Sequence, residues 1–106
     1  MNLQILDAAA IEARDAVFWY DDQQPGLADR FLAEYSGMLE QIEASPVSFS
    51  RYEFNQTSHE TRRAILKNFP YAVIFQIIDP ENIIVLAVAH LSRKPSYWIR
   101  RAADRQ

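Results

Sequence analysis

Side chains that could bind an anion or move a proton gather in the last third of this 106-residue chain. The set comprises His90, Arg93, Lys94, Tyr97, Trp98, Arg100 and Arg101, with Arg63 and Lys67 on a neighbouring predicted strand. Histidine and tyrosine can transfer protons, and arginine can hold a phosphate or stabilise a phosphorane. A metal-free ribonuclease could be built from such parts. The same residue types also anchor protein interfaces, or simply cover a terminal helix packed on a sheet.

Other kinds of catalytic site find little support. The chain has two glycines, too few for a glycine-rich phosphate loop, and no cysteine for a disulfide or a thiolate metal site. His59 and His90 are not spaced with carboxylates as in a zinc site, and no serine lies in a nucleophile motif. Asp21 and Asp22 are expected to be solvated at a helix end. We therefore expect no metal and no cofactor.

Charge is unevenly distributed along the chain. The net charge is −3, but residues 1–50 carry −7, whereas residues 51–106 carry +4. The acidic total argues against tight nonspecific binding of nucleic acid. The basic second half is either a functional face or the ordinary solvated side of the strands.

Two apolar runs predict the centre of a sheet. Ala72–Ile78 and Ile83–Ala89 are joined by the polar turn Asp79–Asn82, which is typical of a hairpin. Neither run alternates apolar with polar residues, so both faces of both strands should be covered.

The first half predicts a short strand and a helical hairpin. Leu3–Leu6 is the expected strand, and Asp7 the expected N-cap of the helix that follows. The apolar stripe expected on that helix is Ile11 and Phe18, with Ala10, Ala13 and Val17 on neighbouring positions. Pro25-Gly26 breaks the chain before a second helix that ends at Ser45-Pro46. Its apolar face is Leu27, Phe31, Tyr35, Met38 and Ile42.

The remaining segments complete an α+β fold. A short strand is expected within Phe49–Phe54, a period-two strand over Thr61–Asn68, a last helix from Pro95-Ser96, and a frayed end over Ala102–Gln106. The prediction is one domain, residues 1–106. In it an N-terminal strand and an antiparallel helical hairpin pack on a small antiparallel sheet of three to four further strands, followed by a short C-terminal helix.

The order of several motifs resembles the RelE/ParE superfamily, toxins of bacterial type II toxin–antitoxin modules. The resemblance rests on Arg62-Arg63, Phe69-Pro70-Tyr71, Val88-Ala89-His90, Arg93, Pro95 and Tyr97-Trp98, and earlier on Ala13–Tyr20, Gly26-Leu27 and Phe31. It runs from about Leu3 to Arg101 and implies the fold already reached from the sequence pattern.

The resemblance implies two alternative activities. RelE-like members cut messenger RNA on the ribosome, and here the corresponding set would be Arg63, Lys67, His90, Arg93 and Tyr97. The catalytic arginine that follows the aromatic residue opening the first hairpin strand is missing, since Ala72 follows Tyr71. The chain is more similar to the ParE-like branch, which is associated with inhibition of DNA gyrase. The candidates for binding that target are Arg93, Lys94, Tyr97, Trp98, Arg100 and Arg101. A third alternative is a non-toxic member that acts only as a binding partner.

Such a toxin implies a cognate antitoxin as its partner in a hetero-oligomer. In the family, that partner covers the sheet and the groove beside the helical hairpin, pairing its main chain with an open sheet edge. Trp19, Tyr20 and Phe31 are the candidate receiving residues. The antitoxin contacts DNA in such complexes, so we expect no sequence-specific DNA reading by this chain. With no signal peptide and no membrane-spanning stretch in the sequence, we expect a cytoplasmic protein.

Overall fold

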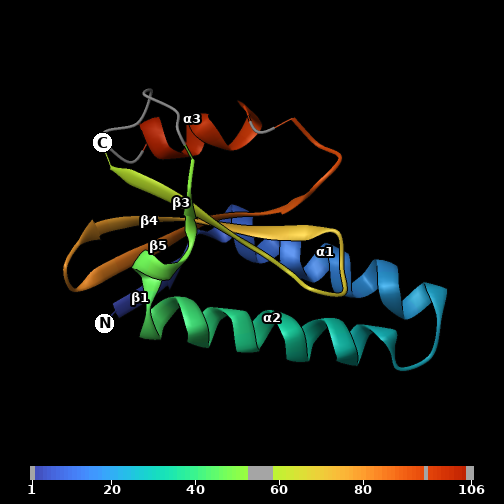
Figure 1. The fold of residues 1–106 in the computed structure, drawn as a ribbon. Helices are drawn as coiled ribbons and strands as arrows, with labels where there is room; N and C mark the ends of the chain where they lie inside the picture. Colours follow the sequence, from blue (N-terminus) through green and yellow to red (C-terminus); the bar gives the residue numbers. More distant parts are fainter. Residues whose placement is uncertain (1, 53–58, 95, 105–106) are drawn as a thin grey trace.

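The structure, a computed structural model, describes residues 2–52, 59–94 and 96–104 (Figure 1). Its elements in chain order are β1 (Asn2–Ile5), α1 (Asp7–Gln23), α2 (Leu27–Ala44), the 3-10 turn η1 (Pro46–Ser48), β2 (Ser50–Arg51), β3 (Glu60–Ile65), β4 (Tyr71–Asp79), β5 (Asn82–His90) and α3 (Ser96–Asp104). This order is the predicted strand, helical hairpin, strands and final helix.

The five strands form one mixed sheet in the order β1-β5-β4-β3-β2. The predicted hairpin is β4 and β5, and each of these strands has a neighbour on both sides. The four further strands, β2–β5, pair antiparallel as predicted, and β1 joins them parallel to β5 through Asn2–Ile5 opposite Asn82–Val85, which makes the whole sheet mixed.

Helices cover both faces of this sheet, α1 and α2 on one side and α3 on the other (Figure 1). Val73, Phe75 and Val85 belong to the core cluster that includes the buried residues of α1 and α2. Ile74 and Leu86 belong to a second cluster that includes Trp98 of α3. The prediction that both faces of the hairpin strands are covered is confirmed.

A bulge in β5 interrupts the alternation between these two clusters. Ile74 lies opposite Ala87 and Phe75 opposite Val85, so Leu86 is an extra residue on the β5 side. Leu86 and Ala87 consequently both contribute to the α3-side cluster. Bulges bend a strand and change which backbone groups face its edges.

The predicted apolar face of α2 is confirmed. Phe31, Tyr35 and Ile42 are buried, and Leu27 and Met38 pack against the same cluster. Phe31 is the centre of an aromatic group, with ring centroids 5.2 Å from Phe69 and 5.5 Å from both Tyr20 and Tyr71.

The predicted apolar stripe of α1 is right at Ala13, which is buried, and at Val17, which packs against the core, but it is wrong at Ala10, Ile11 and Phe18, which are exposed. Ile11 and Phe18 are 47% and 61% exposed, whereas Ala9, Ala13 and Ala16 are buried. A face of alanines lets the helix backbone approach the sheet closely, which larger side chains would prevent. The cap was also misplaced: the helix begins at Asp7, and its N-cap residue, Leu6, makes no capping side-chain bond.

Several other boundaries differ from the predictions. β3 ends at Ile65 rather than Asn68, because Glu34 of α2 binds Asn68 and holds it in the turn. The Asn68 N–H and its amide nitrogen donate to the Glu34 carboxylate at 2.9 and 2.8 Å. Partial burial acts in the opposite direction, but these hydrogen bonds lower the pKa of Glu34.

At the termini of the predicted segments the differences are small. β2 is only Ser50–Arg51, and residues 53–54 of the predicted strand lie outside the described part. Helix α3 continues to Asp104, into the segment predicted to be frayed, and residues 105–106 are outside the described part.

The two aromatic positions Phe31 and Phe18 test the orientation of the helical hairpin. Phe31→Ala is expected to lower the free energy of unfolding by about 3–5 kcal/mol, because it leaves a cavity in the aromatic group. Phe18→Ala removes the same side chain from an exposed position and should change it by less than about 0.5 kcal/mol. Urea unfolding followed by circular dichroism measures both values. Equal losses would contradict the observed orientation of α1.

Candidate functional site

The part of β5 that follows its pairing with β1 has an open edge. β1 ends at Ile5, and the last bond between the two segments runs from the Leu6 N–H to the Val85 carbonyl at 3.0 Å. Among the described strands, none continues along residues 86–90 on this side. Backbone donors and acceptors on such an edge need other partners.

Glu12 of α1 supplies those partners together with Arg101 of α3. The Val88 N–H donates to Glu12 Oε1 at 3.0 Å. Arg101 Nη1 donates to the Leu86 carbonyl at 3.0 Å. Arg101 also binds Glu12 through both oxygens, at 2.8 and 3.1 Å, and the Tyr97 hydroxyl donates to Glu12 Oε2 at 2.8 Å. One carboxylate therefore joins α1, β5 and α3, and we call this group the Glu12 cluster.

The environment of this cluster raises the pKa values of two of its members, Tyr97 and Arg101. Burial, and then the hydrogen bond to Glu12, raise the pKa of Tyr97 far above its usual value. The hydrogen bond to Glu12 also raises the pKa of Arg101. The Glu12 side chain itself is only 15% exposed. A tyrosine that holds its proton this strongly is a poor general base at neutral pH.

The structure divides the six predicted target-binding residues into two groups. Trp98 is 1% exposed, with its ring 5.1 Å from that of Tyr52, so it belongs to the core. Tyr97 and Arg101 are held in the Glu12 cluster.

The other three candidates, Arg93, Lys94 and Arg100, are exposed. The Arg93 guanidinium lies 3.8 Å from the centroid of the Tyr97 ring, and its Nη1 is 3.9 Å from Glu12 Oε2. Its side chain is still 55% exposed, so it remains available to a partner. These three cations form the accessible part of the predicted surface.

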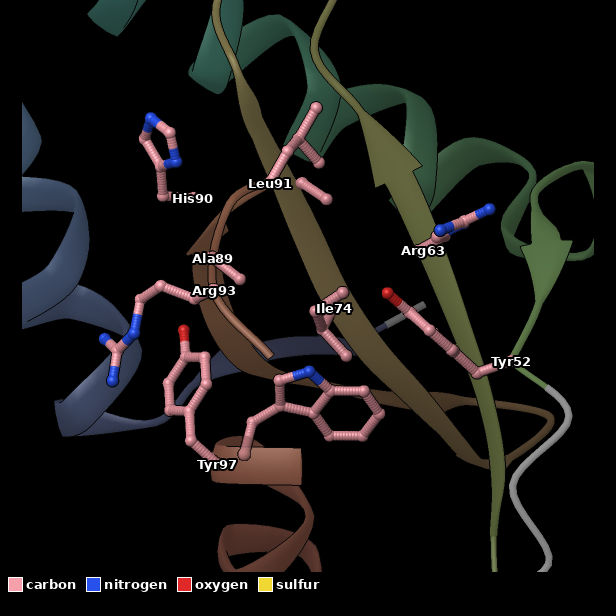
Figure 2. A pocket seen from close by; sticks show the side chains of 10 residues that line it. Tyr52, Arg63, Ile74, Ala89, His90, Leu91, Arg93 and Tyr97 are labelled. Atoms are coloured by element: carbon pink, nitrogen blue, oxygen red, sulfur yellow. The ribbon is translucent and has the colours of Figure 1, made fainter. Parts of the chain in front are cut away.

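A pocket of about 150 Å³ opens on the α3 side of the sheet, and we call it the α3 pocket (Figure 2). It is lined by Tyr52, Arg63, Ala72, Ile74, Ala89, His90, Leu91, Arg93, Tyr97 and Trp98. Four of the five residues of the predicted ribonuclease set are in this lining, and Lys67 is not.

The four do not converge on a common point. Figure 2 shows the Arg63, His90 and Arg93 side chains pointing toward three different sides of the pocket. His90 Nδ1 accepts a hydrogen bond from the Ser92 N–H at 3.1 Å, and the Tyr97 hydroxyl is bound by Glu12. In this structure the four side chains are therefore not gathered around one position that a phosphate could occupy.

The three predicted antitoxin-binding residues have different surroundings. Trp19 is 59% exposed and lines a groove of about 280 Å³ between α1 and the end of β5, which we call the Trp19 groove. Tyr20 is half-buried in the aromatic group, 4.9 Å from Phe69, and Phe31 is completely buried. In this structure Trp19 alone of the three presents a large part of its ring to the surface.

Sequence reasoning missed Glu12, the residue that organises the site. The signal was present but weak: an acid lies directly beside the alanine face of α1, where a solvated residue is the ordinary expectation. Its partners are distant in sequence, at positions 88, 97 and 101. Within the described ranges no three acidic or histidine side chains could hold a metal ion, and no helix is long and apolar enough to cross a membrane.

Comparison with known families decides the identity of this fold. The family model described as the ParE toxin of type II toxin-antitoxin system, parDE, matches residues 4–95. The chain belongs to the ParE toxin family. A solved structure described as the chromosomal ParDE TA system from P. aeruginosa has a similar fold, with a TM-score of 0.59 and 18% identity, covering 87% of this chain and 97% of that chain. Curated protein sequences gave no match.

Glu12 is expected to stabilise the ParE fold by joining its layers. Glu12→Gln keeps the shape and an acceptor for the Val88 N–H, but it removes the charge that binds Arg101. We expect a loss of about 1.5–3 kcal/mol in the free energy of unfolding, the usual contribution of hydrogen bonds to a charged group. Asp15→Asn, which removes a charge from an exposed position of the same helix, is the control and should change little. Denaturant unfolding gives both values.

The raised pKa of Tyr97 predicts a loss of stability at high pH. The folded state binds this proton more tightly than the unfolded state, so the contribution is complete below the ordinary tyrosine pKa of about 10. It is lost as the pH rises from that value toward the folded-state pKa. Unfolding free energies measured between pH 7 and 11 should fall less steeply for Tyr97→Phe than for the unchanged chain. Parallel curves would show that Tyr97 titrates normally.

Proposed function

We propose that this chain is a toxin that arrests bacterial growth by binding DNA gyrase, without performing chemistry itself. In this proposal residues 1–106 act as one domain in the cytoplasm, and a cognate antitoxin neutralises them. The observation that carries the proposal is the match to the ParE family over residues 4–95. Gyrase inhibition is the activity associated with that branch of the superfamily.

The exposed cations beside α3 are the proposed surface for the target. Arg93, Lys94 and Arg100 are accessible, and the second half of the chain carries an excess of positive charge. Exposed charges of one sign accelerate encounter with a surface of the opposite sign and set its orientation. Binding through such a surface needs no catalytic residue.

The divergence of Arg63, His90 and Arg93 weighs against the ribonuclease alternative. Ala72 weighs against it as well, since it lines the α3 pocket where the ribonucleases of the superfamily carry an arginine. A non-toxic binding protein is the remaining alternative, and only a measurement of growth separates it from a toxin.

The antitoxin is proposed to bind at two kinds of site. The Trp19 groove offers an exposed aromatic ring for an apolar anchor. Strand addition is more favourable at the outer edge of β1 than at β5, because Glu12 and Arg101 already occupy backbone groups of β5. In β1 the Asn2 N–H points toward β5, as does the N–H of Leu6 just after the strand, so Leu3 and Ile5 direct their backbone groups outward.

Induced expression without an antitoxin, combined with an assay on purified gyrase, tests the proposed target. We expect growth arrest with filamentation and a DNA-damage response, intact messenger RNA, and inhibition of plasmid supercoiling by gyrase. Arg93→Glu together with Lys94→Glu should weaken that inhibition about tenfold or more, since two exposed cations become acids. Arg30→Glu, an exposed charge reversal on α2, is the control.

The two alternative functions, a ribonuclease and a non-toxic binding protein, give different results in the same assays. Arrest with cleaved messenger RNA and normal supercoiling would establish the ribonuclease instead, and Arg63→Ala with Arg93→Ala should then abolish it. Normal growth at high expression would leave a binding protein with the fold of a toxin.

A further inference from the structure

The α3 pocket has an apolar floor in the chain without a partner. Ala72, Ile74, Ala89 and Trp98 line it, and all four are buried members of the α3-side core cluster. The hollow arises from a cross-strand pair, because Ala72 of β4 lies directly opposite Ala89 of β5. Two alanines facing each other leave the space that larger side chains would fill. The Trp98 ring packs against the ring of Tyr52, which holds it in this position.

The charged side chains that line this pocket are cationic, and the nearby carboxylate of Glu12 lies behind Tyr97 and Arg93, 3.9 Å from the latter. Arg63 and Arg93 lie at the pocket, His90 lies beside them, and none of its described lining residues is acidic. Leu91 adds an exposed aliphatic side chain to the rim. The opposite layer of the molecule has the other sign, since α1 and α2 together carry −7. An acidic segment of a partner is therefore attracted to the α3 side. The Trp19 groove on the hairpin side suits a different, apolar part of the same partner.

We infer that the α3 pocket receives one aliphatic side chain from an acidic, extended segment of the antitoxin. The volume of about 150 Å³ equals that of an apolar cavity that holds benzene, so a leucine, isoleucine or methionine side chain is the right size. Acidic residues on both sides of that anchor pair with Arg63 and Arg93. The inference rests on the proposed function, because the occupant is the antitoxin.

Two variants test this inference separately, one that fills the pocket and one that reverses a charge at its rim. Ala72→Leu fills the space that the aliphatic side chain of the antitoxin would occupy. Arg63→Glu reverses one charge at an exposed position of the pocket lining. Ala33→Leu and Arg30→Glu make the same changes on the exposed side of α2. The probe is the proposed cognate antitoxin of the ParD type, purified separately, and its affinity for each folded variant is measured by calorimetry.

Both pocket variants should weaken binding by about tenfold or more, and both α2 variants by less than about threefold. Added salt should weaken binding of the unchanged chain more than that of Arg63→Glu, because the variant has lost an ionic contact. If Ala72→Leu does not fold, Arg63→Glu and its salt dependence still decide the question.

The same measurements distinguish a failure of the proposed function from a failure of this inference alone. An unchanged chain that does not bind the antitoxin overturns the proposed function and this inference with it. Full binding by the unchanged chain and by both pocket variants overturns the inference alone. A loss for Ala33→Leu as large as that for the pocket variants would place the main contact on the exposed side of α2 and would also overturn the inference.

Discussion

The short length of β1 is the constraint on which the rest of the structure depends. Because β1 pairs with β5 only as far as Val85, the following residues of β5 would expose backbone groups on an edge next to the core. Glu12 and Arg101 bind two of these groups and each other. A buried carboxylate is costly unless it is paired and hydrogen-bonded, and Glu12 satisfies both conditions. The same contacts fix the position of α3 over the sheet.

The fixed position of α3 separates the molecule into two surfaces of different character. The hairpin layer is acidic and packs through alanines and aromatic rings, whereas the α3 side has exposed cations at an apolar pocket. Trp98 anchors α3 from below, and Arg101 anchors it at the edge. The exposed Arg93 lines the pocket beside this helix, with its guanidinium 3.8 Å from the centroid of the Tyr97 ring. Surface function on this side therefore depends on interior contacts made by the same short segment.

The sequence predicted elements wherever local pattern and packing agree. The apolar runs of β4 and β5 and the aromatic face of α2 are examples, because their burial follows from period and composition alone. The prediction that Ile11 and Phe18 are buried was wrong because the hydrophobicity of a residue does not report how closely its helix approaches the sheet. Trp98 and Arg101 have the types expected of an interface, but contacts across more than eighty residues place Arg101 on Glu12. No local pattern contains that information.

Ala72 links the missing chemistry to the pocket. In the ribonucleases of the superfamily an arginine follows the aromatic residue that opens the first hairpin strand, and here that position is Ala72, on the pocket floor opposite Ala89. An arginine side chain at this position would extend into the hollow and occupy it. An arginine at position 72 and an open apolar pocket at this place therefore exclude each other. The alanine found here leaves the pocket open, which agrees with the proposed role of this surface in binding a partner.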